Sequence, residues 1–226
     1  MAIIILAGGK GSRLNSITEY VPKSLIPINN KPIIEWQINH FKKFKCDKFI
    51  ISLGYLADQV INYLQHKNNF GCNIECIIEE CPLGTGGAIK QAIAKQKEQS
   101  HIIINGDIIT DMDISILQSQ LNTIAIIPLR TKYGVVNVNN EKITCFDEKK
   151  EILDKWMNAG VYNLSQKLLE LLPEKGNIEN TLFPIWAKQN LLHVIKYNDI
   201  FWHSIDSYKD IEECENKLNN VDLKYF

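Results

Sequence analysis

The sequence predicts a three-layer α/β fold in which helices cover both faces of a mixed, mostly parallel sheet, with antiparallel strands added in the second half. Short β-branched runs alternate with amphipathic stretches over the first 110 residues, which is typical of a parallel sheet. Beyond residue 110, four strand-like runs follow one another across short gaps, as they do in antiparallel sheets. No linker rich in proline, glycine or serine interrupts the pattern. We therefore expect one Rossmann-like domain over residues 1–226, with halves at 1–110 and 111–226.

The elements of the first half alternate strictly between strand and helix. Strands are expected at Ala2–Leu6, Lys48–Leu53, Asn73–Ile78 and His101–Asn105. A helix opens at Pro32, because proline lacks the N–H that the first helical position does not use. Further helices are expected at Ala57–Gln65 and Gly86–Lys97. Since right-handed crossovers join such strands in parallel, their carboxyl ends should meet at one edge of the sheet.

The second half adds strands with a different rhythm. They are expected at Asn122–Leu129, Gly134–Val138, Lys142–Phe146, Trp156–Tyr162 and Leu192–Lys196. Ser165 is a candidate N-cap for a helix that runs to Leu172. Two more helices are expected at Ile178–Lys188 and Ser207–Leu218. This half should therefore extend the parallel sheet with antiparallel strands.

Composition excludes several classes of protein. Lysine and arginine total 25 against 26 acidic residues, so the formal charge is −1 and the basic excess of a general nucleic-acid binder is missing. The apolar stretch Met1–Ala7 is too short for a membrane span and has no basic segment ahead of it, so we expect neither a span nor a signal peptide. The six cysteines form no Cys-x-x-Cys pair, which favours reduced thiols in a cytoplasmic protein.

A glycine-rich loop follows the first strand. Its sequence is Leu6-Ala7-Gly8-Gly9-Lys10-Gly11-Ser12-Arg13-Leu14. Glycines allow phosphate oxygens to approach the backbone N–H groups, and Lys10, Ser12 and Arg13 add donors and positive charge. Because this loop follows a parallel strand, where ligands usually bind, it suits a polyphosphate better than it suits a merely flexible turn.

Two other phosphate-binding motifs fit this loop poorly. A P-loop needs Gly-Lys followed by Ser or Thr, but Gly11 follows Lys10 here. A dinucleotide fingerprint needs a third glycine where Leu14 stands and an acidic residue where Gly54 and Tyr55 follow the second strand. An NAD-dependent oxidoreductase is therefore disfavoured.

A second motif places one lysine between prolines, in Val21-Pro22-Lys23-Ser24-Leu25-Ile26-Pro27-Ile28. Prolines restrict the backbone, so Lys23 should be held in a defined position, although a solvated surface lysine is the commoner case. Together the two motifs resemble the signature of the sugar-phosphate nucleotidyltransferase family, Leu-Ala-Gly-Gly-x-Gly-Thr-Arg-Leu followed by Pro-Lys-Pro. Ser12 and Ser24 are the two small departures.

Later segments resemble the same family in the same order. They are Glu79–Ala88, Asn105–Asp107, Phe146–Lys149, Asn158–Tyr162 and Ile205–Asp206. In the first of them, and in its short chain, the sequence looks closest to the heptose 1-phosphate and mannose 1-phosphate guanylyltransferases. The resemblance implies transfer of a nucleotidyl group to a sugar 1-phosphate with release of pyrophosphate, and residues 1–110 and 111–226 as the nucleotide-binding and sugar-phosphate-binding halves.

The resemblance also implies a role for each site residue. Catalysis would fall to Arg13, Lys23 and Asp107. The nucleotide would be bound by Leu6, Ala7, Gly8, Gly9, Gly11, Ser12, Glu79, Gly84 and Thr85. The sugar phosphate would be bound by Gly134, Glu148, Lys149, Asn158 and Gly160. Asp107 and Asp206 would hold Mg²⁺, which takes one or two carboxylates and leaves its other positions to water and phosphate.

Some alternatives stay open. The acceptor could be a hexose 1-phosphate used by a uridylyl-, thymidylyl- or cytidylyltransferase, or a small non-sugar phosphate. A sensor without catalysis is disfavoured because Arg13, Lys23 and Asp107 are all present. The family commonly has a glycine just beyond its last aspartate, whereas Ser207 and Tyr208 follow Asp206, so the turn there should differ. No nucleic acid or membrane partner is expected, and a homo-oligomer is possible.

Overall fold

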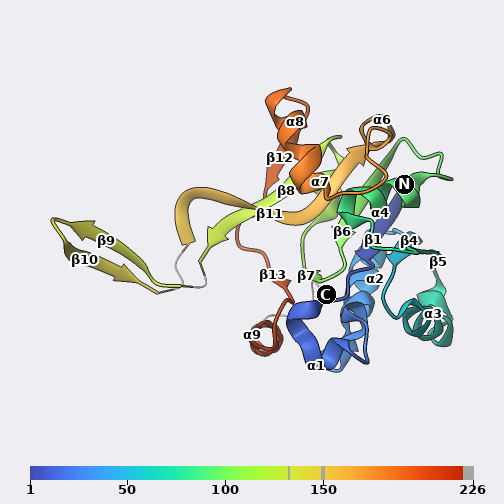
Figure 1. The fold of residues 1–226 in the computed structure, drawn as a ribbon, viewed down its shortest axis with the longest axis horizontal. Coiled ribbons are helices and arrows are strands. Elements are labelled where there is room, and N and C mark those ends of the chain that lie inside the picture. The colour runs from blue at the N-terminus through green and yellow to red at the C-terminus, as the bar shows by residue number, and fades with distance from the viewer. Residues whose placement is uncertain (132, 149–150, 221–226) are drawn as a thin grey trace.

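A seven-stranded mixed sheet (Figure 1) forms the centre of the computed structural model, which describes residues 1–131, 133–148 and 151–220. The strands are β1 Ala2–Ala7, β4 Lys48–Leu53, β5 Asn73–Ile78, β6 Ser100–Asn105, β8 Thr123–Arg130, β11 Glu151–Ser165 and β12 His193–Lys196. Their order is β12-β8-β11-β6-β1-β4-β5. Only β11 runs against its neighbours, since β1, β4, β5 and β6 pair in parallel and β12 is parallel to β8. The expected mixed, mostly parallel sheet is confirmed.

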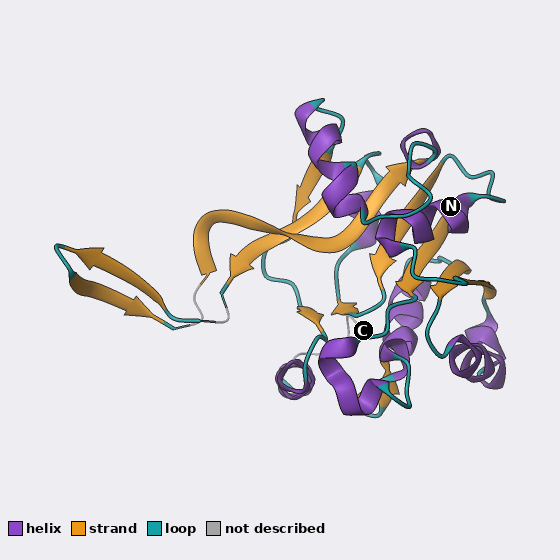
Figure 2. Cartoon of the chain, viewed as in Figure 1, coloured by secondary structure: helices purple, strands orange, loops and turns teal. Residues whose placement is uncertain are grey.

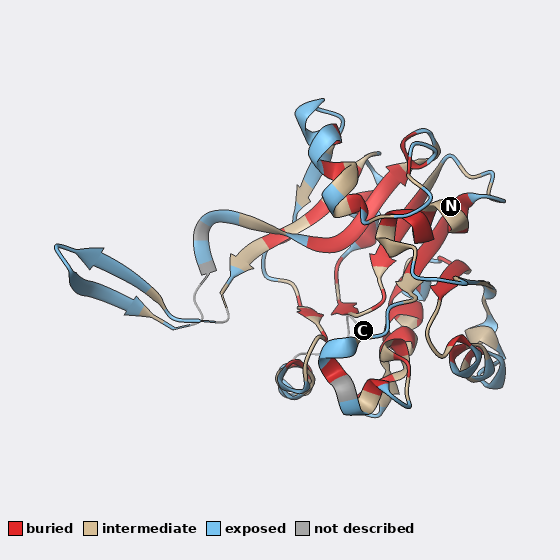
Figure 3. Cartoon of the chain, viewed as in Figure 1, coloured by how far each residue is buried: buried red, intermediate tan, exposed pale blue. Residues whose placement is uncertain are grey.

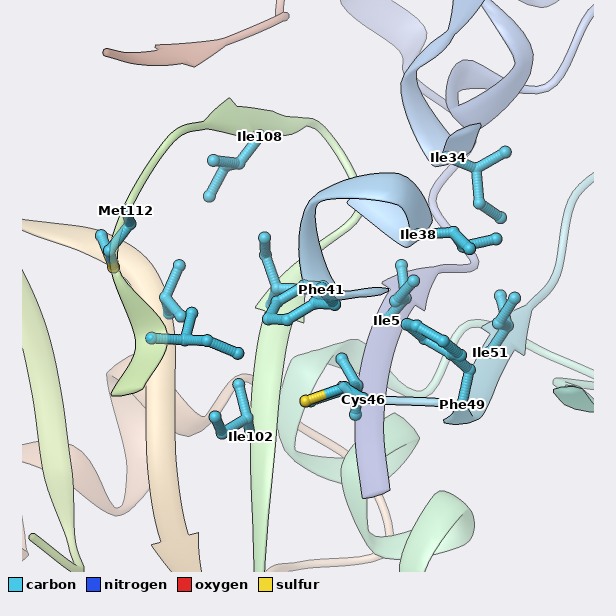
Figure 4. Close-up of a cluster of buried hydrophobic side chains, with 14 of the residues drawn as sticks. Ile5, Ile34, Ile38, Phe41, Cys46, Phe49, Ile51, Ile102, Ile108 and Met112 are labelled. Atoms are coloured by element: carbon cyan, nitrogen blue, oxygen red, sulfur yellow. The ribbon is translucent and has the colours of Figure 1, made fainter. Parts of the chain in front are cut away.

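The central strand β1 shows why the sheet has helices on both faces. Its residues 2–5 are completely buried, as expected for a parallel strand covered on both sides. Ile3 and Ile5 pack into one core with α2 and α3, while Ala2 and Ile4 pack into a second core with α4 and α6–α8. Alternating side chains along one strand therefore join the two helical layers, and Figure 4 shows the first core, with Ile5 close to Ile38 and Phe41.

The longer helices lie close to their predicted ranges. The α-helices are α1 Asn15–Thr18, α2 Ile33–Lys43, α3 Ala57–His66, α4 Gly84–Ile93, α5 Ile114–Gln118, α6 Gln166–Leu169, α7 Ile178–Thr181, α8 Phe183–Lys188 and α9 Tyr208–Leu218. Three short 3₁₀ turns are η1 Ser12–Leu14, η2 Lys23–Leu25 and η3 Asn68–Gly71. The helix expected at Ile178–Lys188 is divided into α7 and α8, with Pro184 in the first turn of α8, where proline is tolerated. None of the described helices is long and apolar enough to cross a membrane.

Short strands outside the main sheet complete the fold. They are β2 Pro27–Ile28, β3 Lys31–Pro32, β7 Ile108–Thr110 and β13 Trp202–Ser204. The pairing of β13 with β7 is antiparallel, and beyond it Ile205 N donates to Asp107 O at 2.9 Å. The segment that follows β13 is thereby brought against the turn that follows β6.

One prediction for the second half is wrong. The strands at Gly134–Val138 and Lys142–Phe146 form, as β9 Val135–Asn139 and β10 Lys142–Asp147, but they do not join the central sheet. They pair only with each other, as a hairpin that stands apart from the other strands (Figure 2). Their sequence has strand character, but nothing local in a sequence determines which sheet a hairpin joins.

Candidate active site

A cavity of about 700 Å³ opens where the parallel strands end. It is lined by the glycine loop 6–13, by residues 79–82, 84 and 85 after β5, by residues 105–107 after β6, and by Lys23 and Asp206. These segments leave β1, β5 and β6 at their carboxyl ends, the usual ligand-binding edge of an α/β sheet. The structure therefore brings the predicted nucleotide-binding segments together.

The glycine loop is held at both ends and open at its tip. A Cβ atom at Gly8 would lie 2.2 Å from Glu79 Oε1, so a larger residue there would displace the Glu79 carboxylate. Gly11 has a φ of +64°, and its carbonyl accepts hydrogen bonds from Leu14 N at 2.9 Å and Thr18 Oγ1 at 3.0 Å. Nothing lies within 4 Å of a Cβ placed at Gly9. A phosphate can therefore approach the backbone at Gly9 in a loop that is already shaped.

Four charged side chains meet at the mouth of this loop. Lys23 Nζ donates to Asp107 Oδ2 at 2.7 Å and to Asp206 Oδ1 at 2.9 Å, and Arg13 Nη2 donates to the same Asp206 oxygen at 2.8 Å. Partial burial works against ionisation of Asp206, but Lys23 and then Arg13 hold its pKa below the usual range. The group is electrically balanced without substrate, so anionic phosphates can compete with the two aspartates for both cations.

The two carboxylates suit a divalent metal ion. Their oxygens converge on one ammonium group, so a single cation can contact both, and carboxylate oxygens are preferred ligands of hard divalent ions. Asp107 follows β6 and Asp206 follows β13, and the β7–β13 pairing brings these turns together. The missing glycine after Asp206 does not keep its side chain from the site.

The predicted base-binding segment, Glu79–Ala88, makes hydrogen bonds to other parts of the protein. Glu79 accepts hydrogen bonds from Ser52 Oγ at 3.1 Å and Leu83 N at 3.0 Å, so both its carboxylate oxygens are engaged. At the start of α4, Gly86 N donates to Gly176 O at 2.9 Å. A Cβ at Gly84 would lie 2.8 Å from that same carbonyl oxygen. The glycines thus allow the helix to begin directly against the loop before α7.

Two predicted sugar-binding residues, Asn158 and Gly160, lie on β11, and Gly160 lies beside the turn that carries Asp107. Asn158 Nδ2 donates to the hydroxyl of Tyr162 at 2.8 Å, and Asn158 Oδ1 accepts from Gly160 N at 2.8 Å. Gly160 has a φ of +68°, and a Cβ there would lie 2.5 Å from Ile108 Cδ1. Burial raises the pKa of Tyr162, and the charge of Glu179 raises it further, so its hydroxyl stays protonated.

None of the predicted sugar-binding residues that the structure describes lines the cavity, Asn158 and Gly160 included. Gly134 and Glu148 lie together at the base of the β9–β10 hairpin, where a Cβ at Gly134 would meet Phe146 at 2.5 Å and Glu148 Oε2 at 3.0 Å. Neither residue lines the cavity. Lys149 lies outside the described residues.

Sequence reasoning missed Asn177 and Glu179. Asn177 lines the cavity, and its Oδ1 accepts from Thr85 N at 3.2 Å. Glu179 Oε2 accepts from Thr85 Oγ1 at 2.5 Å, and Glu179 Oε1 accepts from the Tyr162 hydroxyl at 3.4 Å. Glu179 therefore joins the two halves of the chain. The only signal was a pair of polar residues at a predicted helix start, which is an ordinary capping pattern.

A second group of candidate metal ligands comes from residues on both sides of Asp206 in the chain. One ring nitrogen of His203 and one carboxylate oxygen each of Asp210 and Glu213 lie within 4.8 Å of one another. Asp210 Oδ2, however, accepts from Asp206 N at 3.1 Å and Ser207 Oγ at 2.9 Å. The protein's own hydrogen bonds thus account for this carboxylate, which stabilises the Asp206 turn.

Comparison with known proteins finds relatives along most of the chain. A family model described as nucleotidyl transferase matches residues 2–220. A D-glycero-alpha-D-manno-heptose 1-phosphate guanylyltransferase of Aneurinibacillus thermoaerophilus is 34% identical over 189 residues, covering 79% of this chain and 82% of the relative. Its counterpart in Campylobacter jejuni is 34% identical over 190 residues, covering 80% and 85%. The crystal structure of HddC from Yersinia pseudotuberculosis complexed with GMP-PN matches with a TM-score of 0.75 and 26% identity, over 96% of this chain and 99% of that chain.

Proposed function

The chain belongs to the nucleotidyl transferase family, and from that premise we propose that it condenses a nucleoside triphosphate with a sugar 1-phosphate to give a nucleotide-sugar and pyrophosphate. The observation that carries the proposal is the position of Lys23, between Asp107 and Asp206 at the mouth of a preformed glycine loop. Two polyanions must meet in this reaction and a third must leave, so its main requirement is charge neutralisation.

The reaction needs no protein base. A phosphate oxygen of the sugar 1-phosphate bonds to the α-phosphorus while the bond to the bridging oxygen breaks, and the electron pair leaves with pyrophosphate. The second pKa of a phosphate monoester is about 6, so the nucleophile is already mostly dianionic at neutral pH. This agrees with a cavity that is lined by cations, carboxylates and backbone N–H groups.

Each charged residue has a distinct part in the proposal. Arg13 holds the phosphates that leave, because its forked guanidinium can bind two oxygens at once. Lys23 contacts the α-phosphate or the incoming phosphate, as a point charge that can follow the charge as it moves. Asp107 and Asp206 would hold Mg²⁺, which supplies neutralisation of the phosphate oxygens when bound. The backbone of the loop binds the remaining phosphate oxygens.

We further propose guanine as the base and a heptose or mannose 1-phosphate as the acceptor. The names of the two relatives at 34% identity support this choice. In this proposal the base is read by Glu79 and by the backbone of Leu83, Gly84 and Thr85, and the presence of Glu79, Gly84 and Thr85 in the cavity lining supports this. Because Ser52 and Leu83 already bind Glu79, a base would have to share that carboxylate. A uridylyl-, thymidylyl- or cytidylyltransferase of a hexose 1-phosphate, and a transferase of a small non-sugar phosphate, are the alternatives.

In this proposal residues 1–110 bind the nucleotide and residues 111–226 bind the sugar phosphate, as parts of one domain. The sugar-phosphate residues are Gly134, Glu148, Lys149, Asn158 and Gly160. Six free cysteines suit the reducing cytoplasm, where we place the reaction.

A pyrophosphate-release screen tests the proposal. Nucleoside triphosphates are paired with a panel of hexose and heptose 1-phosphates and phosphocholine, with Mg²⁺ and with a chelator. We expect release only with a metal and a sugar 1-phosphate, fastest with GTP and a heptose or mannose 1-phosphate. Release with another base selects the first alternative, and release with phosphocholine selects the second. Failure of every pair would overturn the proposal.

A further inference from the structure

Each of the two aspartates at the cavity stands on a turn whose backbone is bound by one buried side chain from a helix. Gln37 of α2 binds the turn that carries Asp107, and Asp210 of α9 binds the turn that carries Asp206. Neither side chain lines the cavity. Their fractional exposures are 2% for Gln37 and 4% for Asp210.

Gln37 joins the two ends of the Asp107 turn through hydrogen bonds. Its Nε2 donates to Asn105 O at 2.8 Å and to Ile108 O at 2.9 Å, the carbonyls on either side of Gly106 and Asp107. Gly106 N donates to Leu6 O at 2.9 Å on the opposite side. An apolar residue in place of Gln37 would leave both buried carbonyls without this donor, and unpaired buried carbonyls are costly. The turn can relieve that cost only by moving, and Asp107 would move with it.

The position of Gln37 on its helix supports a specific role. Ile33, Ile34, Ile38 and Phe41 on the buried face of α2 are apolar, and His40 is the other buried polar residue of this helix. A buried amide among them is not needed to fill the core, and Gln37 Oε1 has no hydrogen-bond partner among the described residues. Burying such a group without full pairing costs stability. The two hydrogen bonds that Gln37 donates to the Asp107 turn offset this cost.

Asp210 binds the turn that carries Asp206, as Gln37 binds the turn that carries Asp107. Its Oδ2 accepts from Asp206 N at 3.1 Å and from Ser207 Oγ at 2.9 Å, while Asp210 N donates to Ser207 Oγ at 3.3 Å. This reciprocal pair resembles a capping box and begins α9 directly after Asp206. The turn lacks a glycine, so the orientation of Asp206 depends on this cap.

We propose that Gln37 and Asp210 are positioning residues that set the spacing of the Asp107 and Asp206 carboxylates, and through it the affinity of the site for a divalent cation. This inference rests on the proposed function, because it takes those two carboxylates as the metal ligands. Partners that hold the ligands of a metal site without touching the metal commonly change its affinity by about 10- to 100-fold when they are removed.

The test measures cation binding directly. Mn²⁺ is titrated into the protein with a non-hydrolysable GTP analogue, and free Mn²⁺ is followed by electron paramagnetic resonance. Gln37→Met keeps the size of the side chain and removes the donor. We expect the Mn²⁺ dissociation constant to rise about tenfold, with the analogue still binding in the absence of metal.

Asn163 provides a matched control. It is 1% exposed, and its Nδ2 also joins two backbone carbonyls, those of Leu117 and Gln120, at 3.0 Å each, but it does not line the cavity. Asn163→Leu should destabilise the fold comparably and leave Mn²⁺ affinity unchanged. Equal Mn²⁺ affinities for Gln37→Met and Asn163→Leu would overturn the role of Gln37, whatever their melting temperatures.

A second pair tests Asp210, and stands even if Gln37→Met does not fold. Asp210→Asn keeps an oxygen that accepts the two hydrogen bonds, so its Mn²⁺ affinity should stay within about twofold of wild type, whereas Asp210→Ala should weaken it about tenfold. Equal affinity in Asp210→Ala and wild type would refute the role of Asp210. If the wild-type protein itself binds no Mn²⁺ and releases no pyrophosphate, it is the proposed function that fails.

Discussion

The cavity at the sheet edge and the β9–β10 hairpin contrast in how the fold controls their residues. At the cavity, Arg13, Lys23, Asp107 and Asp206 come from distant parts of the chain and meet within hydrogen-bonding distance. In the hairpin, the apolar side chains Val136, Val138, Ile143 and Phe146 lie on one face and remain largely exposed (Figure 3). The sheet thus positions the first group, and only local pairing positions the second.

The difference shows that burial of a strand fixes the positions of the residues that follow it. Residues that follow strands with covered faces inherit the register of the sheet, because a shift of one residue would move every side chain to the opposite face, into packing made for another residue. A two-stranded hairpin alone is marginally stable in water and transmits no such constraint. A residue in this protein is therefore held in a fixed position where the strand that carries it is buried, and less firmly where that strand is exposed.

The largest effect is expected from Asp107→Asn. Loss of the carboxylate removes one proposed metal ligand, so kcat/KM should fall by about 10³-fold or more while the fold is retained. Pyrophosphate release and the melting temperature check this. Glu141→Gln, which neutralises a carboxylate at the hairpin tip, should keep wild-type rates. A wild-type rate in Asp107→Asn would remove that residue from its role.

Two identical substitutions compare the stability of the two regions. Phe41 is 1% exposed in the core of Figure 4, and Phe146 on the hairpin is 63% exposed. Phe41→Ala should lower the free energy of unfolding by about 3–5 kcal/mol, because it leaves a cavity. Phe146→Ala should change it by about 0.5 kcal/mol or less, as surface substitutions do. Urea unfolding measures both, and a large loss for Phe146→Ala would show that the hairpin face is covered in solution.

A smaller effect should come from Glu148→Gln at the hairpin base. If Glu148 binds sugar hydroxyls during turnover, the KM for the sugar 1-phosphate should rise about tenfold, because one charged hydrogen bond is worth roughly 1.5 kcal/mol. The KM for the nucleotide should stay unchanged. Steady-state kinetics with each substrate varied decide the point, and an unchanged sugar KM would separate the hairpin base from the sugar site.

The smallest effect concerns the loss of stability in acid, which we expect to depend on a histidine buried in the central sheet. Burial lowers the pKa of His101 on β6, although Gln166 and Glu98 oppose the shift. The folded state therefore favours neutral His101, so its stabilising contribution is full above about pH 6.5 and declines as pH falls toward the folded pKa. Between pH 7.5 and 5.5, His101→Gln should therefore lose less stability than the wild type does. Urea unfolding at the two pH values measures the difference, and an identical slope in His101→Gln and wild type would contradict the assignment.

Much of the cavity could be predicted from the chain alone. The glycine loop, Lys23, Asp107 and Asp206 were all expected at one edge and are found there. For the glycine loop and Asp107 that success follows from the parallel sheet, in which loops after successive strands emerge on the same side. Asp206 is brought there by the antiparallel pairing of β13 with β7. Asn177 and Glu179 were not expected, because a polar residue that begins a helix looks the same whether it caps the helix or faces a cavity.

The sequence by itself determined the order of strands and helices, the glycine loop after β1 and the family, because apolar periodicity and short motifs are local properties. Only the tertiary structure decided that β9 and β10 leave the central sheet, that Lys23 lies between two carboxylates, and that Gln37 and Asp210 hold the turns beneath them. The bonds of Lys23 and Gln37 join residues at least 68 positions apart. Such contacts exist only once the layers have packed, because burial is what makes an unpaired carbonyl or carboxylate costly.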